Sequence, residues 1–209
     1  MTASPPSSLT KEMTTETIRQ GMIDCMSGSH VLRDEEIRFV LNSVSVKHFK
    51  KGTILLQEGQ IPTACYCNYQ GCVRQFYLKD GEEKTTFFYT EGQPIATITS
   101  EVLRKPAKFY LECVEDTFLT VMPYECESEL FRRFPKFEAY GRLDMERRLI
   151  EYQEMLAAYI TTTPEERYLN VLKDRPDLVH RVPQYQLASY LGIKPESLSR
   201  IRKRIMMRA

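Results

Sequence analysis

Two charged side chains near the end of the chain, Glu196 and Arg200, have types and spacing suited to reading a base sequence. An arginine can donate two hydrogen bonds to O6 and N7 of guanine, and a glutamate can accept one from the N4 amine of cytosine. From Lys194 to the end there are six basic residues and one acid, so this segment is near +5 although the whole chain is only +1. The segment therefore combines base-reading chemistry with a charge that suits a phosphate backbone.

Two short helices joined by a tight turn would position these side chains. Counted from Gln184 as position one, the fifth residue is Ala188, which is small where the second helix crosses the first. The ninth is Gly192, which adopts a left-handed conformation without steric penalty. All seven diagnostic positions match a helix-turn-helix. The alternative interpretation is an ordinary helical hairpin with a solvated basic end. The five positions that must be apolar are Leu187, Leu191, Ile193, Leu198 and Ile201.

The second helix of such a motif presents its first turns to base edges, while basic residues further along suit phosphates. Glu196 and Arg200 would then choose sequence, whereas Lys203 and Arg204, with Arg208 beyond them, would hold the protein on the backbone. The full set of candidate nucleic-acid contacts is Gln184, Tyr185, Lys194, Pro195, Glu196, Ser197, Ser199, Arg200, Lys203 and Arg204.

Upstream of the motif, the sequence predicts an α+β chain. A Ser, Thr and Pro-rich start over 1–15 lacks periodic apolar positions and is expected to be a flexible tail. Helical patterns follow, one of them over 33–44. From about 50 to 122, short β-prone runs are separated by glycines roughly every ten residues, as in a small barrel or sandwich. Within this region, Asp80-Gly81 suits a tight hairpin turn.

The longest helical candidate spans 135–160. Leu149, Tyr152, Leu156 and Tyr159 recur in it at intervals of three and four, which favours a helix that pairs with its copy in a homodimer. Packing on its own domain is the alternative. After this helix, Thr163, Pro164 and Glu166 have the spacing of a capping box that begins a new helix.

A glycine-punctuated β region, a long central helix and a C-terminal helix-turn-helix together resemble the Crp/Fnr superfamily of bacterial transcription regulators, over roughly residues 20–209. The family's Glu-x-x-x-Arg pattern on the recognition helix is matched by Glu196 and Arg200. The resemblance implies a double-stranded β-helix or jelly-roll-like β-roll sensor domain over 16–134, a dimerisation helix over 135–160 and a winged-helix-like DNA-binding domain over 161–209. Because the sequence ends at Ala209, a β-hairpin wing after the recognition helix is not expected.

The same resemblance implies the partners. They are double-stranded DNA carrying a pseudo-palindromic operator, a second copy of the chain, and RNA polymerase. The alternative function is a β-roll module that senses a small molecule, an anion or a redox change and acts through protein partners.

Binding of cyclic AMP is not expected, and no cofactor is predicted. Members that bind it carry a Gly-Glu pair for the ribose and an Arg followed by Ser or Thr for the cyclic phosphate. The matching positions here hold Ala96 and Thr97, then Ala107 and Lys108, so both the ribose acceptor and the bidentate phosphate partner are missing. Arg104 or Lys108 could instead offer a point charge to another anion in this candidate effector pocket.

Other classes of site have little support in the sequence. No structural disulfide is expected among the six cysteines of a cytoplasmic chain of this length, and Cys65, Cys67 and Cys72 fit core positions better than cluster ligands. The three histidines are isolated, so no metal site is predicted. We find no phosphate loop or nucleophile elbow, which argues against an enzyme, and no apolar run long enough to cross a membrane.

Overall fold

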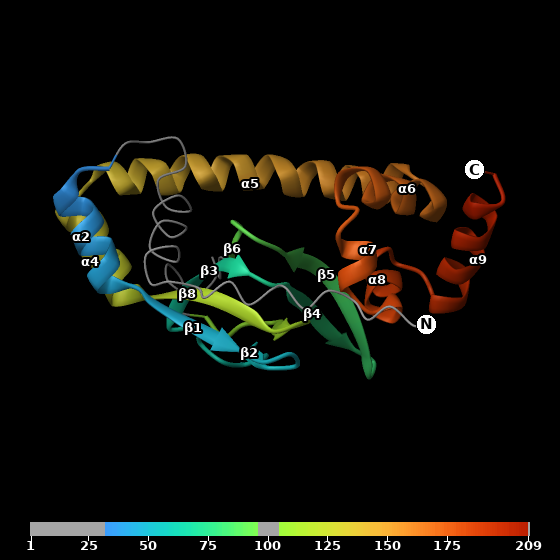
Figure 1. Ribbon diagram of the computed structural model, residues 1–209, viewed down its shortest axis with the longest axis horizontal. Coiled ribbons are helices and arrows are strands. Elements are labelled where there is room, and N and C mark those ends of the chain that lie inside the picture. Colours follow the sequence, from blue (N-terminus) through green and yellow to red (C-terminus); the bar gives the residue numbers. More distant parts are fainter. Residues whose placement is uncertain (1–31, 96–104, 209) are drawn as a thin grey trace, which may run out of the picture.

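The computed structural model of the chain describes residues 32–95 and 105–208. In chain order, a short helix leads into eight antiparallel strands, and helices follow to the end (Figure 1). The expected tail over 1–15 lies outside the described residues. The strands are β1 Ser45–Phe49, β2 Ile54–Leu56, β3 Ala64–Gln70, β4 Val73–Lys79, β5 Glu82–Tyr89, β6 Pro94–Ile95, β7 Tyr110–Cys113 and β8 Thr117–Pro123. The helices are α2 Asp34–Ser43, α4 Tyr124–Arg133, α5 Lys136–Thr161, α6 Pro164–Asp174, α7 Leu178–Arg181, α8 Gln184–Tyr190 and α9 Pro195–Met206.

The strands form two four-stranded sheets, ordered β1-β8-β3-β6 and β2-β7-β4-β5, which is the expected β-roll. The expected Asp80-Gly81 hairpin joins β4 to β5, with Lys79 paired to Glu82. Both turn residues have positive φ, 54° for Asp80 and 78° for Gly81, as this kind of two-residue turn requires. Side chains from both sheets fill the interior, among them Val73, Ile95, Leu111 and Leu119, each fully buried.

Helices α2 and α4 close one end of the roll beside the start of α5 (Figure 1). A buried carboxylate ties α2 to α5. The Glu36 side chain is fully buried and pairs with Lys136 Nζ at 2.6 Å and with the Arg33 guanidinium at 2.8 Å. Burial raises the pKa of Glu36, but the hydrogen bonds from Lys136 and from Arg33 outweigh it and lower the pKa to about 2.

The long helix expected over 135–160 is α5, Lys136–Thr161, which runs along one side of the β-roll (Figure 1). It is tied to the roll on one face: Arg148 is buried and donates to the Pro94 carbonyl at 2.8 Å, and Tyr152 meets the Phe87 ring. Phe137 near its start is buried, but many of its later apolar side chains are in solvent, with Leu149 58% and Leu156 61% exposed. A long helix with an exposed apolar stripe is suited to pairing with another helix.

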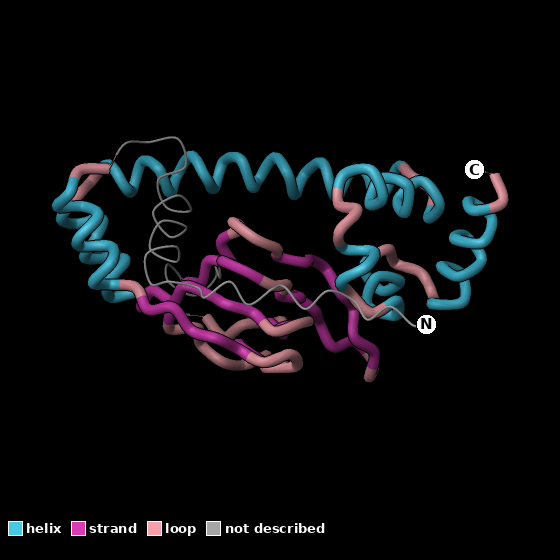
Figure 2. Tube along the Cα trace, viewed as in Figure 1, coloured by secondary structure: helices cyan, strands magenta, loops and turns pink. Residues whose placement is uncertain are grey.

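The expected capping box begins α6, with Thr163 Oγ1 accepting from the Glu166 backbone and Glu166 accepting from the Thr163 backbone. The helices that follow gather beyond the end of α5, beside β4 and β5 (Figure 2). In the described residues 161–208 there is no strand, so the helix-turn-helix has no β-wing there.

The C-terminal helices and the β-roll share one hydrophobic core. Cys72, Phe88 and Val114 of the roll pack in a single buried cluster with residues of α6 to α9, including Leu187 and Leu198. The DNA-reading end expected from the sequence is therefore fastened to the sensor fold of its own chain rather than suspended from α5 alone.

The buried carboxylate makes a prediction about acid stability. Because the folded pKa of Glu36 lies below its unfolded value of about 4.3, its contribution is complete above that value and is lost as pH falls toward 2. We expect the urea midpoint of the wild type to drop between pH 5 and pH 3, and Glu36→Gln to flatten that dependence. Glu35→Gln, an exposed neighbour on the same helix, is the control. Equal pH dependence in the wild type and Glu36→Gln would contradict the assignment.

Candidate nucleic-acid interface

The two helices of the motif are α8 and α9, and the turn between them is built as the sequence predicts. Leu187, Ala188 and Leu198 are fully buried, and Gly192 has a φ of +70°. The Ile193 N–H donates to the Ala188 carbonyl at 3.0 Å, and the Gly192 N–H donates to the Ser189 carbonyl at 3.0 Å. This pair of bonds is a Schellman turn, which ends α8 and sets the direction of α9.

One face of α9 is buried and the opposite face is open. Leu198 and Ile201 point into the core. At about 100° per residue, the side opposite them carries Glu196, Ser199, Arg200 and Lys203, all four of which are exposed. A glutamate and an arginine whose types could read bases thus share the open face with a lysine suited to a phosphate. Figure 1 shows α9 at the outer limit of the molecule, with α8 between it and the β-roll.

The other predicted contacts lie on α9 or just before it, except Gln184 and Tyr185, which begin α8. Most of them are exposed, but Ser197 is half-buried and accepts a hydrogen bond at 3.2 Å from the Arg200 guanidinium, which holds that side chain along the helix. Arg204 is exposed but engaged in an ion pair with Glu165 of α6. The exposed members are Gln184, Tyr185, Lys194, Pro195, Glu196, Ser199, Arg200, Lys203 and Arg204.

A serine hydroxyl attaches α8 to the β-roll. Among the described strands, β5 stands at the edge of its sheet. Ser189 Oγ accepts from the Thr85 backbone N–H at 2.9 Å and donates to the Glu83 carbonyl at 2.8 Å, so it takes the place of a neighbouring strand. The Tyr190 ring meets Phe88 edge to face, with centroids 5.4 Å apart.

Two arginines reinforce the attachment. Arg175 donates to the Phe88 carbonyl and to Thr90 Oγ1, both at 2.9 Å. The guanidinium of Arg181 pairs with Glu91 at 2.7 Å and with Glu115. The hydrogen bond that Arg181 donates to Glu91 raises the pKa of Arg181. Burial raises the pKa of the Glu91 carboxyl, but the hydrogen bond from Arg181 contributes to lowering it below its usual value. The contacts of Ser189, Arg175 and Arg181 with the β-roll were not predicted from the sequence, because no spacing or periodicity links these residues with their partners.

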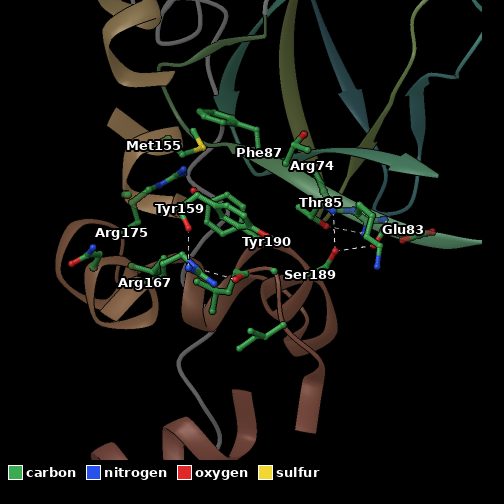
Figure 3. Close-up of a pocket in the computed structure, with 18 of the residues that line it drawn as sticks. Arg74, Glu83, Thr85, Phe87, Met155, Tyr159, Arg167, Arg175, Ser189 and Tyr190 are labelled. Carbon is green, nitrogen blue, oxygen red and sulfur yellow. Dashed lines mark hydrogen bonds and ion pairs between the residues drawn. The ribbon is translucent and has the colours of Figure 1, made fainter. Parts of the chain in front are cut away.

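An open cleft of about 1760 Å³ lies between β5, the end of α5 and the helix-turn-helix (Figure 3). At its α5 end the Arg167 guanidinium lies 4.7 Å from the Tyr159 ring centroid. Arg167 also donates to the carbonyls of Thr162 at 2.7 Å and of Leu191 at 3.1 Å. One guanidinium therefore caps both the end of α5 and the turn after α8. The carbonyl groups at the C-terminal end of a helix carry partial negative charge, so a cation is favourable there.

The candidate effector pocket is only partly described. Ala96, Thr97 and Arg104 lie outside the described residues. Ala107 is buried, and its backbone bonds both ways with the loop after β2, accepting from Gly59 and donating to Gln60. Lys108 is exposed. The suggestion that this region binds an anion stays a prediction.

The cysteines behave in two ways. Burial raises the pKa of Cys72 to about 12 and that of Cys113 to about 11, so both thiols stay protonated and pack as small apolar groups. Cys67 of β3, however, is disulfide-bonded, and the expectation that no cysteine forms a disulfide is wrong. That expectation rested on chain length and compartment, which do not determine which thiols lie within bonding distance.

Within residues 32–95 and 105–208, no group of three or more His, Cys, Asp or Glu side chains could hold a metal ion. No helix in this described part of the chain is long and apolar enough to cross a membrane.

Comparison with known proteins identifies the fold. Residues 46–134 match the cyclic nucleotide-binding domain family. No match was found among the curated proteins. Among solved structures, the catabolite activator protein of Thermus thermophilus is 22% identical with a TM-score of 0.54, and the match covers 86% of each chain.

Two further structures agree. The c-di-GMP-responsive regulator CLP of Xanthomonas campestris is 17% identical with a TM-score of 0.67, covering 84% of this chain and 92% of that one. FixK2 of Bradyrhizobium japonicum is 15% identical with a TM-score of 0.67, covering 79% and 85%. These likenesses confirm the expected α+β fold, in which a β-roll that matches the cyclic nucleotide-binding domain family precedes a helical C-terminal region.

The turn before α9 gives a prediction about stability. Gly192→Ala places a Cβ at a left-handed φ and 2.2 Å from Tyr159 Oη, and we expect a loss of at least about 1 kcal/mol in the free energy of unfolding. Gly141→Ala in α5 is the matched control, because its Cβ meets nothing closer than 3.8 Å and alanine favours the helix. Urea unfolding of both variants makes the comparison; if Gly192→Ala were as stable as Gly141→Ala, the turn would not need its glycine.

Proposed function

We propose that this chain is a Crp/Fnr-type transcription regulator that binds a pseudo-palindromic DNA operator as a homodimer. The observation that carries the proposal is the open face of α9, where Glu196 and Arg200 stand together on a helix oriented by a helix-turn-helix. A second helix related by a two-fold axis would enter the next major groove, about 34 Å away. RNA polymerase is the expected protein partner, and the cytoplasm the expected location.

The sensor function follows from the domain match, with one restriction. A cyclic nucleotide-binding domain over 46–134 supports a regulator that responds to a ligand. The sequence offers Ala107 and Lys108 where cyclic AMP binders place Arg and Ser or Thr, so an ordinary cyclic AMP complex is not part of the proposal. Any effector must bind one arrangement of the DNA-reading helices more tightly than another in order to control them.

The test of the DNA-binding proposal is selection of bound fragments from random duplex DNA by the purified full chain, followed by titration at two salt concentrations. An enriched inverted repeat with steep salt dependence supports a dimeric sequence reader. Failure to enrich any sequence, together with binding that ignores salt, would favour the alternative of a sensing module that acts through protein partners.

The two roles assigned on α9 separate by mutation. Arg200→Ala should reduce discrimination at one base position by about 1–3 kcal/mol, because a bidentate contact to guanine is lost. Lys203→Ala should weaken binding to every sequence alike and lower the salt slope by about one. Competition binding on operators changed one base at a time measures both. If Arg200→Ala lowered the affinity for specific and random DNA equally, Arg200 would not be a base-reading residue.

Dimerisation through α5 has its own test. Leu149, Tyr152, Leu156 and Tyr159 follow a heptad seam, and Leu156→Glu would place a charge at its centre. We expect this variant to be monomeric in sedimentation analysis and to lose the advantage of a full operator over a half-site. Ile150→Glu is the matched control, because Ile150 is 56% exposed but lies one position past Leu149, off the seam. A Leu156→Glu protein that stays dimeric would place the interface elsewhere.

A further inference from the structure

Two of the basic residues near the end of the chain are held by an acid from another helix. Arg204 lies one helical turn after Arg200 on α9, at the edge of the open face, where it meets Glu165 of α6. Its guanidinium is 2.6 Å from Glu165 Oε2. Arg208, beyond the end of α9, reaches the same carboxylate, with Nη1 2.7 Å from Oε1. Each oxygen of Glu165 therefore holds one arginine.

Glu165 is well placed to keep both cations. It lies in the first turn of α6, where the helix dipole favours a negative charge. Its side chain is only 21% exposed, whereas those of Arg204 and Arg208 are 53% and 67% exposed. The carboxylate is thus the more sheltered member of each pair, and the arginines are the members that a phosphate backbone could reach.

These ion pairs reduce the number of cations that are free to contact DNA phosphates. Affinity for DNA of any sequence grows with the number of cations free to replace counterions on phosphates. An arginine already paired with a carboxylate must give up that pair to contact a phosphate, and the carboxylate itself repels the backbone. Among the basic residues from Lys194 onward, Arg204 and Arg208 are engaged in this way within the described part of the chain.

We propose that Glu165 is a specificity-determining residue: by holding Arg204 and Arg208, it limits binding to DNA of arbitrary sequence and leaves discrimination to the open face of α9. The proposal rests on the proposed DNA-binding function and deepens it. It also revises the expectation that Arg204 is a phosphate contact, since in this arrangement the phosphate-binding role falls to Lys203.

The test measures the affinity of the full-length protein for random duplex DNA and for the selected operator over a range of salt concentrations. Glu165→Gln keeps the shape of the side chain but releases both arginines. We expect random-sequence affinity at low salt to rise by about 2- to 10-fold, the salt slope to steepen by about one to two, and the ratio of specific to random affinity to fall.

Two controls isolate the cause. Asp174→Asn makes the same change in net charge at an exposed position at the other end of α6, and should leave the salt slope at its wild-type value. In an Arg204→Met, Arg208→Met background, Glu165→Gln should no longer steepen the slope, because it acts through those arginines. Urea unfolding confirms that each variant is folded.

The outcomes are distinct. A Glu165→Gln slope equal to that of the wild type or of Asp174→Asn overturns the proposal, and so does weaker binding, which would mean that Glu165 aims the arginines at phosphates. If the affinity of the wild-type protein for duplex DNA did not depend on salt, the proposed DNA-binding function itself would be contradicted. Random-sequence binding can be compared even if no operator has been found, so the two failures are separable.

Discussion

The arrangement of this molecule depends on a hydrophobic core shared between the β-roll and the C-terminal helices. Phe88 and Val114 of the roll are buried together with Leu187 and Leu198 of the helix-turn-helix. Apolar burial has no direction, so the core by itself would tolerate sliding. Ser189 and Arg175 supply the direction, because they bond to backbone groups of β5 and its end whose positions the sheet fixes. The location of α9 is therefore set by the edge strand of the β-roll.

A second attachment fixes the same unit from another side. Arg167 bonds to carbonyls at the end of α5 and at the turn after α8 and stacks on Tyr159, whose hydroxyl approaches Gly192. The helix-turn-helix thus touches both the sheet that contains β5 and the long helix α5. A ligand that shifts either one alters contacts at the turn itself. Because packed interfaces switch between discrete arrangements rather than deforming continuously, such a shift would move α9 as a unit.

The sequence predicts the parts of this protein that obey local rules, and misses those that depend on distant pairs. The helix-turn-helix was predictable because a small residue, a left-handed glycine and five apolar positions are required within eighteen residues of each other. The Asp80-Gly81 hairpin and the Thr163 capping box are equally local. By contrast, Ser189 meets Glu83 across 106 positions, and no periodicity links them. The pairing of Glu165 with Arg204 escaped prediction for the same reason.

The charges near the end of the chain show what composition can predict and what it cannot. From Lys194 onward the excess of positive charge indicates an affinity for polyanions, and the structure gives those charges different surroundings. Lys203 stands in solvent on the same face as Glu196, whereas Arg204, its neighbour in the chain, is paired. The 100° step of a helix separates them, and the acid that completes the pair comes from the first turn of another helix. The net charge of this segment therefore indicates the class of partner. The strength of non-specific attraction depends on which cations remain unpaired on the side that faces that partner.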